Sequence, residues 1–194
     1  MIVVFGSINI DLVARVPALP RAGETVAGPD YQVIPGGKGA NQALAARRAG
    51  ADVIMVGAVG RDGFAETALS ALSAEGVDVT RVTPADAPTG AAFIAVDAAG
   101  QNQIVVAAGA NAAVLASALD GIDTSPRDIL LLQWEVPEVE ILAAARWARA
   151  RDMRVMLNRA PAGPISAELA GLLDVVIVNE HEVLALGAGF DIDA

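Results

Sequence analysis

Two polar residues near the start of the chain could bind the hydroxyl groups of a ligand. GSINIDL is expected at the end of the first strand, where Asn9 and Asp11 alternate with apolar residues, so both side chains can project together from the strand's carboxyl end. A carboxylate accepts hydrogen bonds from two hydroxyls, and a carboxamide both donates and accepts them. An Asx turn at the end of a strand would explain the same two residues.

A glycine-rich stretch, PGGKGANQALAARRAG, combines close backbone approach with polar side chains. Gly36 and Gly37 carry no Cβ and let the backbone come near a ligand. Lys38 follows, and a helix then opens with Asn41 in its first turn, where free N–H groups favour an anion or several hydroxyls. The spacing fits neither the dinucleotide-binding fingerprint nor the P-loop. A glycine-rich turn into an Ala-rich helix would account for the glycines but not for Lys38 together with Asn41.

Polar residues also follow three successive apolar runs later in the chain. Glu135 comes after the first run, Asn158 after the second, and Asn179 and Glu182 after the third. Ligands of open α/β sheets bind at the carboxyl ends of the strands, so these side chains are candidates for a common site. A single residue of this kind could equally be a charge in the first turn of a helix.

Short apolar runs rich in β-branched residues alternate with Ala-rich stretches of helical period. This alternation predicts an α/β fold in which a doubly wound, mostly parallel sheet is flanked by helices. Strands are expected at Ile2–Phe5, Val53–Val59, Ile129–Leu132, Arg154–Leu157 and Val175–Val178, and helices at Gly39–Ala49, Ala65–Ala74, Val136–Ala150 and Ser166–Leu172.

Two segments depart from that alternation. Thr25–Ile34 alternates apolar and polar residues, and Thr89–Val106 has the pattern of a hairpin. We expect them to form a small β-sheet lid, with strands from about 12–34 and 89–108, on a single α/β domain of residues 1–194. Thr80–Pro88 has the composition of a linker that leads into the hairpin.

Composition excludes several classes of protein. The net charge is −10 and the basic residues are scattered, so no nucleic-acid partner is expected. The chain contains no cysteine, which excludes disulfides and Cys-ligated zinc. No apolar run reaches the roughly 20 residues of a membrane span, and the first residues lack the features of a signal peptide. We therefore expect no membrane partner and a cytoplasmic location.

The order of these motifs resembles the PfkB-type carbohydrate kinases, the family that includes ribokinase. The resemblance covers essentially the whole chain. It implies an ATP-dependent kinase that transfers the γ-phosphoryl group to the primary hydroxyl of a sugar, with D-ribose and ribose 5-phosphate as the expected substrate and product. The matching segments, in order, are GSINID, PGGKGANQA, TG at Thr89–Gly90, AGAN at Ala108–Asn111, QWEVP, LNRAPA and VNEHE.

The resemblance also implies roles for individual residues. Asn179 and Glu182 match an N-x-x-E element that organises ATP and Mg²⁺, with Glu182 contacting the metal through water. The lid would close over the sugar and pair with a second copy to form a homodimer. The implied sugar-binding residues are Asn9, Asp11, Gly36, Gly37, Lys38, Asn41 and Glu135.

The sequence departs from the family pattern in two places. The run Gly-Ala-Gly-Asp, whose Asp is the family's catalytic base, does not occur, and GAGF at Gly187–Phe190 ends in Phe instead. We therefore expect an N-terminal portion that is inactive alone, with the catalytic Asp, the nucleotide pocket and a K⁺ site lying beyond residue 194. Alternatives are a non-catalytic sugar-binding relative, or a fructose or nucleoside kinase of the same superfamily. In LNRAPA, Arg159 takes the place of the usual Pro, where it could reach a phosphate or point to solvent.

Overall fold

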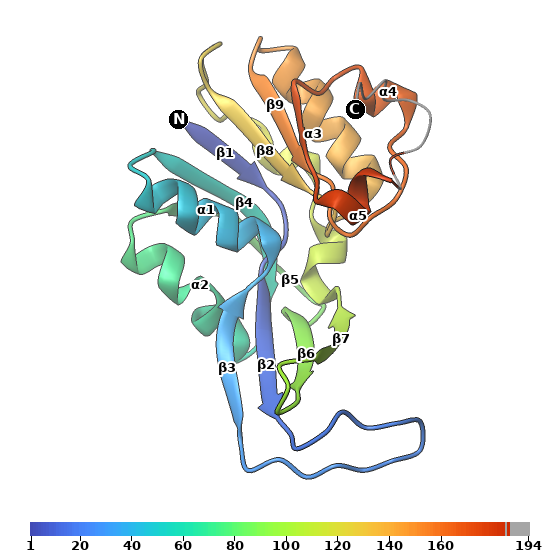
Figure 1. Ribbon diagram of the computed structural model, residues 1–194. Helices are drawn as coiled ribbons and strands as arrows, with labels where there is room; N and C mark the ends of the chain where they lie inside the picture. Colours follow the sequence, from blue (N-terminus) through green and yellow to red (C-terminus); the bar gives the residue numbers. More distant parts are fainter. Residues whose placement is uncertain (185, 187–194) are drawn as a thin grey trace.

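The computed structural model describes residues 1–184 and 186, which form two sheets. The six-stranded main sheet is parallel, in the order β10-β9-β8-β1-β4-β5, and the second sheet has the order β3-β2-β6-β7 (Figure 1). The strands of the main sheet are β1 (Ile2–Phe5), β4 (Val53–Gly60), β5 (Asp78–Ala85), β8 (Ile129–Gln133), β9 (Arg154–Asn158) and β10 (Val175–Ile177). The helices are α1 (Lys38–Arg48), α2 (Phe64–Ala74), α3 (Glu138–Arg149), α4 (Ala167–Ala170) and α5 (Glu180–Val183), with 3-10 turns η1 (Gly109–Ala113) and η2 (Ala116–Leu119).

Strand β1 is apolar throughout because both faces of the main sheet are covered. Val4 points into a cluster shared with α1 and α2, whereas Val3 and Phe5 point into a cluster shared with α3. All three side chains are fully buried, and each such burial stabilises the fold by about 1.5–3 kcal/mol. The α/β fold predicted from the sequence is therefore confirmed. No helix in the described part of the chain is long and apolar enough to cross a membrane.

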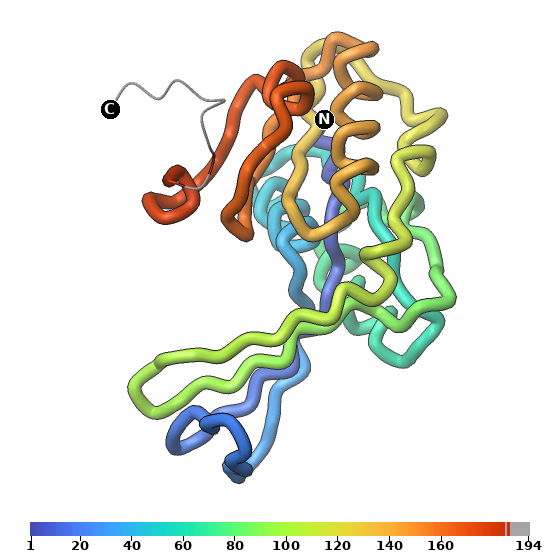
Figure 2. Tube along the Cα trace, turned by 90° about the vertical axis from the view of Figure 1, so that its right-hand side faces the viewer, coloured from blue at the N-terminus to red at the C-terminus, as the bar shows by residue number. Residues whose placement is uncertain are grey.

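The second sheet consists of strands that project together from the α/β body (Figure 2). Strand β2 pairs with β3 in antiparallel fashion and with β6 in parallel fashion, and β6 and β7 form the expected hairpin. The strand predicted at Thr25–Ile34 is shorter than expected, because the segment before Tyr31 is interrupted by Gly28 and by Pro29, which has no N–H to donate. The strands are β2 (Asn9–Arg15), β3 (Tyr31–Gly36), β6 (Gly90–Val96) and β7 (Asn102–Ala107).

Two sequence-based predictions about the chain path are wrong. Asn9 and Asp11 do not lie at the end of the first strand; the chain leaves β1 at Phe5 and enters the separate strand β2 at Asn9. Thr80–Pro88 is not a linker, because most of it belongs to β5, the edge strand beside β4. Pro84 is tolerated there because one side of an edge strand needs no N–H donors.

A polar clasp joins the end of β4 to the start of β6. The Asp62 carboxylate accepts hydrogen bonds from the Thr89 backbone N–H at 2.7 Å and from the Thr89 hydroxyl at 2.8 Å. The Gly60 N–H donates in turn to the Thr89 hydroxyl oxygen at 2.9 Å. These bonds, first of all the one from the Thr89 N–H, hold the pKa of Asp62 below its usual value. The clasp therefore fixes the second sheet to the main sheet.

The clasp predicts a pH-dependent loss of stability in Asp62→Ala. Hydrogen bonds to a charged group are worth about 1.5–3 kcal/mol, so we expect the free energy of unfolding at pH 7 to fall by about 2 kcal/mol. Folding lowers the pKa of Asp62, so its carboxylate stabilises the folded state fully at pH values above the reference pKa of 3.8. This stabilisation is lost as the pH falls through the pKa of the folded state. Urea unfolding between pH 3 and 7 measures the difference.

Asp86→Ala serves as the matched control, because Asp86 is exposed and has only a 3.7 Å ion pair with Arg61. We expect this variant to unfold like the parent chain. Equal stabilities for the Asp62 and Asp86 variants at pH 7 would contradict the role of the clasp.

Candidate functional site

The predicted site residues surround one pocket of about 290 Å³ where the second sheet meets the start of α1. Six of the seven predicted sugar-binding residues line it, and Gly36 does not. Strands β6 and β7 supply the opposite wall, which is apolar. The polar wall contains Asn9, Asp11, Gly37, Lys38, Asn41 and Glu135, and the apolar wall contains Ala92, Ile94, Ile104 and Val106.

The two adjacent glycines are required by close contacts. A Cβ at Gly36 would lie 2.4 Å from Oδ1 of Asp11, so the absence of a side chain leaves room for the Asp11 carboxylate. Gly37 has a φ of 90°, and a Cβ there would lie 2.8 Å from the backbone nitrogen of Asn9. These glycines let the start of α1 approach β2. Gly37 lines the pocket itself, whereas Gly36 shapes it from behind Asp11.

Glu135 occupies the N-terminus of α1. Its Oε2 accepts hydrogen bonds from the Ser7 hydroxyl at 2.6 Å and from the Lys38 backbone N–H at 3.0 Å. The next two N–H groups of the helix, of Gly39 and Ala40, donate to Oγ and to the carbonyl of Ser7. The first-turn N–H groups that the sequence assigns to a ligand are therefore occupied by the protein itself, and the anion that the helix dipole favours is Glu135.

Asp11 and Glu135 place two carboxylates in one small pocket. Burial, and secondarily the charge of Glu135, raise the pKa of the Asp11 carboxyl. Lys38 and the amides of Asn9 and Asn41 complete the polar wall. Such a set can bind several neighbouring hydroxyls, since the carboxylates accept hydrogen bonds while the amides and the ammonium donate them.

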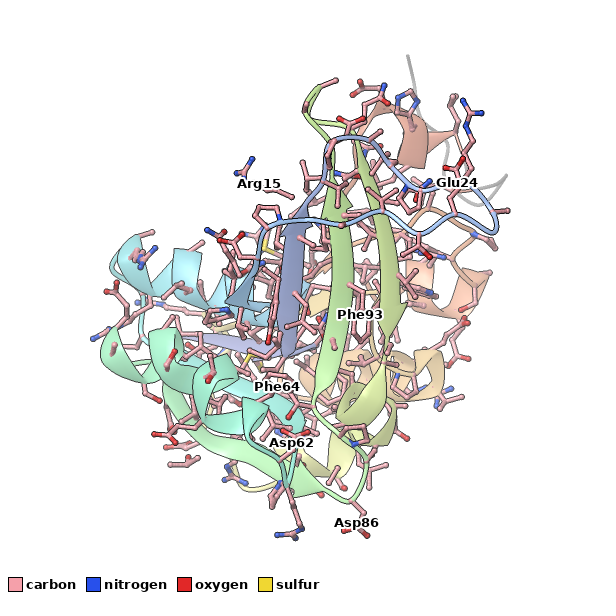
Figure 3. All side chains as sticks on the ribbon, turned by 90° about the horizontal axis from the view of Figure 1, so that it is seen from below. Arg15, Glu24, Asp62, Phe64, Asp86 and Phe93 are labelled. Atoms are coloured by element: carbon pink, nitrogen blue, oxygen red, sulfur yellow. The ribbon has the colours of Figure 1, made fainter. Side chains whose placement is uncertain are left out.

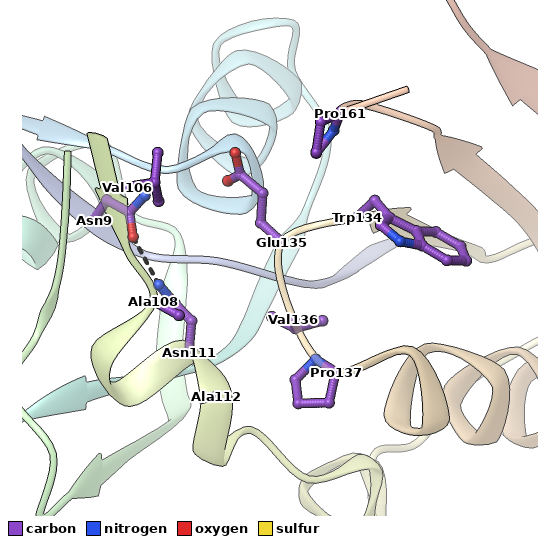
Figure 4. Close-up of a pocket in the computed structure, with 10 residues that line it drawn as sticks. All are labelled: Asn9, Val106, Ala108, Asn111, Ala112, Trp134, Glu135, Val136, Pro137 and Pro161. Atoms are coloured by element: carbon purple, nitrogen blue, oxygen red, sulfur yellow. Dashed lines mark hydrogen bonds between the residues drawn. The ribbon is translucent and has the colours of Figure 1, made fainter. Parts of the chain in front are cut away.

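A second pocket of about 410 Å³ adjoins the first and shares Asn9, Val106 and Glu135 with it. Its lining is otherwise mostly apolar and includes Trp134 and Pro161 (Figure 4). Trp134, which directly follows β8, therefore lies at this second pocket.

Arg159 neither reaches a pocket nor points to solvent. Its guanidinium lies 3.8 Å from the ring centroid of Trp134 and donates to the carbonyl oxygens of Pro161 and Pro164. The residue is buried, and this burial lowers the pKa of Arg159. The alternative that the side chain points to solvent is therefore wrong, because the residue holds the loop after β9 against Trp134. Contact with a phosphate stays a prediction.

Asn179 and Glu182, which were predicted to bind the nucleotide, line neither pocket, and neither does Asn158, which was predicted only to lie near the site. Asn158 ends β9, and its Oδ1 is buried without a hydrogen-bond partner among the described residues. Asn179 caps α5: its Oδ1 accepts from the N–H groups of His181 and Glu182, and Glu182 Oε2 accepts from the Asn179 N–H at 2.9 Å. The N-x-x-E spacing thus forms a capping box. Gly187–Phe190 lies outside the described residues.

Three comparisons identify similar proteins. A model described as pfkB family carbohydrate kinase matches residues 1–188. Ribokinase of Haemophilus influenzae is 41% identical over 182 residues, which is 92% of this chain and 60% of that protein. The crystal structure of ribokinase from Thermotoga maritima has a TM-score of 0.83 at 36% identity, covering 94% of this chain and 60% of that one.

A structure of Arabidopsis thaliana ribokinase complexed with ribose and ATP has a TM-score of 0.82 at 29% identity. The match covers 94% of this chain and 61% of that chain. The chain thus spans about 60% of the length of the relatives it matches.

The raised pKa of Asp11 predicts that Asp11→Asn stabilises the chain. A carboxyl group whose pKa is raised by folding destabilises the folded state at pH values above its pKa in the unfolded chain. Removing the negative charge of Asp11 should therefore stabilise the folded state at neutral pH. We expect the melting temperature at pH 7 to rise by roughly 2–4 °C, the shift that about 1 kcal/mol produces in a chain of this size. This increase in melting temperature should become smaller as the pH falls towards 3.8, the ordinary pKa of an Asp carboxyl.

Calorimetric melting from pH 4 to 8 measures this profile, with the exposed Asp120→Asn as the control. A lower melting temperature for Asp11→Asn at pH 7 would show that the carboxylate stabilises the fold and would overturn the electrostatic account of the pocket.

Proposed function

The chain belongs to the pfkB family of carbohydrate kinases, and we propose that it binds the sugar substrate of an ATP-dependent kinase, with D-ribose as that sugar. The observation that carries this proposal is the pocket with Asp11 and Glu135 on one wall and apolar strands on the other. Its volume of about 290 Å³ suits a small ligand rather than a nucleotide.

The pocket's chemistry matches a monosaccharide. A sugar presents hydroxyl hydrogens, which the carboxylates of Asp11 and Glu135 can accept, and hydroxyl oxygens, to which Lys38 can donate. Its ring also has faces of C–H groups, which the Ile94 and Ile104 side chains can cover. An orienting polar wall and an apolar cover together hold a flexible polyol in one pose, which is what phosphoryl transfer chiefly requires of a protein.

We propose that Asn179 and Glu182 face the nucleotide. Bound ATP with Mg²⁺ would supply the phosphoryl group and neutralise its charge. The capping box uses one oxygen of Glu182, and the other has no hydrogen-bond partner among the described residues. A single carboxylate oxygen suits a hydrated ion, so Glu182 would contact Mg²⁺ through water, because Mg²⁺ usually keeps several of its waters in proteins.

These 194 residues are proposed to bind sugar without transferring phosphate by themselves. The family's Gly-Ala-Gly-Asp run, with its base, is not in this sequence. Loss of a general base typically lowers a rate by ~10²–10⁴-fold.

The outer face of the second sheet is proposed to pair with a second copy of the chain. Side chains alternate along its strands, so that Ile104 and Val106 line the sugar pocket while Phe93 and Val105 line the other face. Phe93 is labelled in Figure 3. Tyr31, Phe93 and Val105 are 65%, 49% and 67% exposed. These three residues line an apolar hollow of about 530 Å³ whose lining contains no charged residue, and such a face is suited to self-pairing about a twofold axis.

The sugar proposal predicts ribose binding that depends on Asp11. Titration calorimetry of the 194-residue chain should show one site for D-ribose, and Asp11→Ala should weaken binding at least ~100-fold, because hydrogen bonds to a charged acceptor are lost. D-fructose and adenosine should bind less well. Added ATP and Mg²⁺ should yield no ribose 5-phosphate.

Thermal melting of the same samples separates loss of the site from loss of the fold. Tight binding of fructose or adenosine instead of ribose would assign a different sugar class. Unchanged ribose affinity in a folded Asp11→Ala chain would refute the site, and turnover would refute the lack of transfer.

The pairing proposal predicts that Phe93→Glu converts a dimer to a monomer. Ile177→Glu is the matched control, since Ile177 is 43% exposed but lies on β10, away from the second sheet. Sedimentation equilibrium should give a dimer for the parent and the control and a monomer for Phe93→Glu. A monomeric parent chain would exclude this partner.

A further inference from the structure

Asn111 holds a buried position that the functions discussed so far do not use. It lies in η1, directly after the β6–β7 hairpin, and is only 2% exposed. Its Oδ1 accepts the Ile8 N–H at 2.9 Å, and its Nδ2 donates to the Ile8 carbonyl oxygen at 3.2 Å. A backbone N–H can only donate and a carbonyl can only accept, so these two bonds fix which end of the Asn111 amide is which.

The orientation of Asn111 determines that of Asn9. The Nδ2 of Asn111 also donates to Oδ1 of Asn9 at 2.7 Å, drawn as the dashed line in Figure 4. The oxygen of the Asn9 amide is therefore occupied inside the protein. Its Nδ2 has no hydrogen-bond partner among the described residues, although Asn9 is 96% buried and lines both pockets. The free donor of a buried amide is thus available to a ligand.

Gly90 provides the space for this pair of amides. A Cβ at Gly90 would lie 2.3 Å from Nδ2 of Asn111 and 2.3 Å from Oδ1 of Asn9. Gly90 is not among the residues with positive φ, so its backbone conformation suits any residue. The TG and AGAN segments of the sequence therefore meet in space at the Asn9 side chain.

We propose that Asn111 is a positioning residue that determines what the pocket recognises. With the space that Gly90 leaves, it holds the Asn9 amide with its N–H₂ toward the ligand. The pocket then demands an acceptor oxygen opposite Asn9, in addition to the hydroxyl hydrogens accepted by Asp11 and Glu135. The identity of the ligand as a sugar rests on the proposed function, whereas the orientation of the amides does not.

Two isosteric variants test the orientation. In Asn9→Asp, one carboxylate oxygen still accepts from Asn111, and the other replaces the pocket-facing N–H₂. In Asn111→Asp, the carboxylate cannot donate to the Ile8 carbonyl or to Asn9. Both variants add one negative charge at nearly the same place, so each is the electrostatic control for the other. We expect Asn111→Asp to melt several degrees below Asn9→Asp.

The same variants test recognition. Asn9→Asp should lose D-ribose affinity at least ~10-fold while staying folded, because an acceptor now faces the sugar oxygen. In Asn111→Asp, the Asn9 amide should turn to donate to the new carboxylate. The side-chain amide signal of Asn9 in a ¹⁵N spectrum can be assigned because it is missing from the spectrum of Asn9→Asp. In Asn111→Asp without sugar, this signal should lie at a different shift from that in the parent chain. Adding ribose should then leave it unchanged.

The outcomes separate this proposal from the proposed function. A lower melting temperature for Asn9→Asp than for Asn111→Asp would overturn the assigned orientation. Parent-like ribose affinity in Asn9→Asp would overturn the role of the donor. If the parent chain binds no sugar, the proposed function fails, and the two melting temperatures and the Asn9 amide signal still decide the orientation.

Discussion

The arrangement of the site depends on the contact between the Glu135 carboxylate and the start of helix α1. Glu135 follows strand β8, Ser7 lies between β1 and β2, and Lys38 begins the helix. A single carboxylate oxygen of Glu135 accepts hydrogen bonds from both Ser7 and Lys38. Three segments from distant parts of the sequence are thereby fixed at one point. A carboxylate beside a helix N-terminus is stabilised by the unpaired N–H groups and by the helix dipole. Its other oxygen remains available to the pocket.

The same contact sets the electrostatics of the pocket. Holding Glu135 at the helix places a second negative charge near the partly buried Asp11, whose pKa rises as a result of burial and of that charge. Two carboxylates in one small pocket are unfavourable for folding alone, and they become favourable when a ligand brings hydroxyl hydrogens. The proposed binding of a polyol would supply those hydrogens to both carboxylates.

Sequence patterns predicted the strands that are buried on both faces of the main sheet. They did not predict where the chain leaves one sheet and enters the other. The strand at Ile2–Phe5 was predictable because a continuous apolar run is what a strand covered on both faces needs. The separate strand β2 was not, since the run of alternating residues from Asn9 gives no sign that it changes sheets. The polar residues of the pocket could be found because glycines and charged residues stand out in an apolar sequence.

The partners of those residues could not be predicted in the same way. Ser7, Gly90 and Asn111 are small or neutral, and their role exists only through contacts across up to 128 residues of chain. Arg159 likewise shows its stacking on Trp134 only in the folded chain.

The measurement that tests the central claim most directly is an NMR titration of the ¹⁵N-labelled chain with D-ribose. The account predicts saturable shifts at the backbone amides around Asn9–Asp11, Gly37–Asn41 and Glu135, and at Ile104–Val106 on the facing strand. Shifts confined to other parts of the chain, or none at millimolar ribose, would contradict the claim that this pocket binds the sugar.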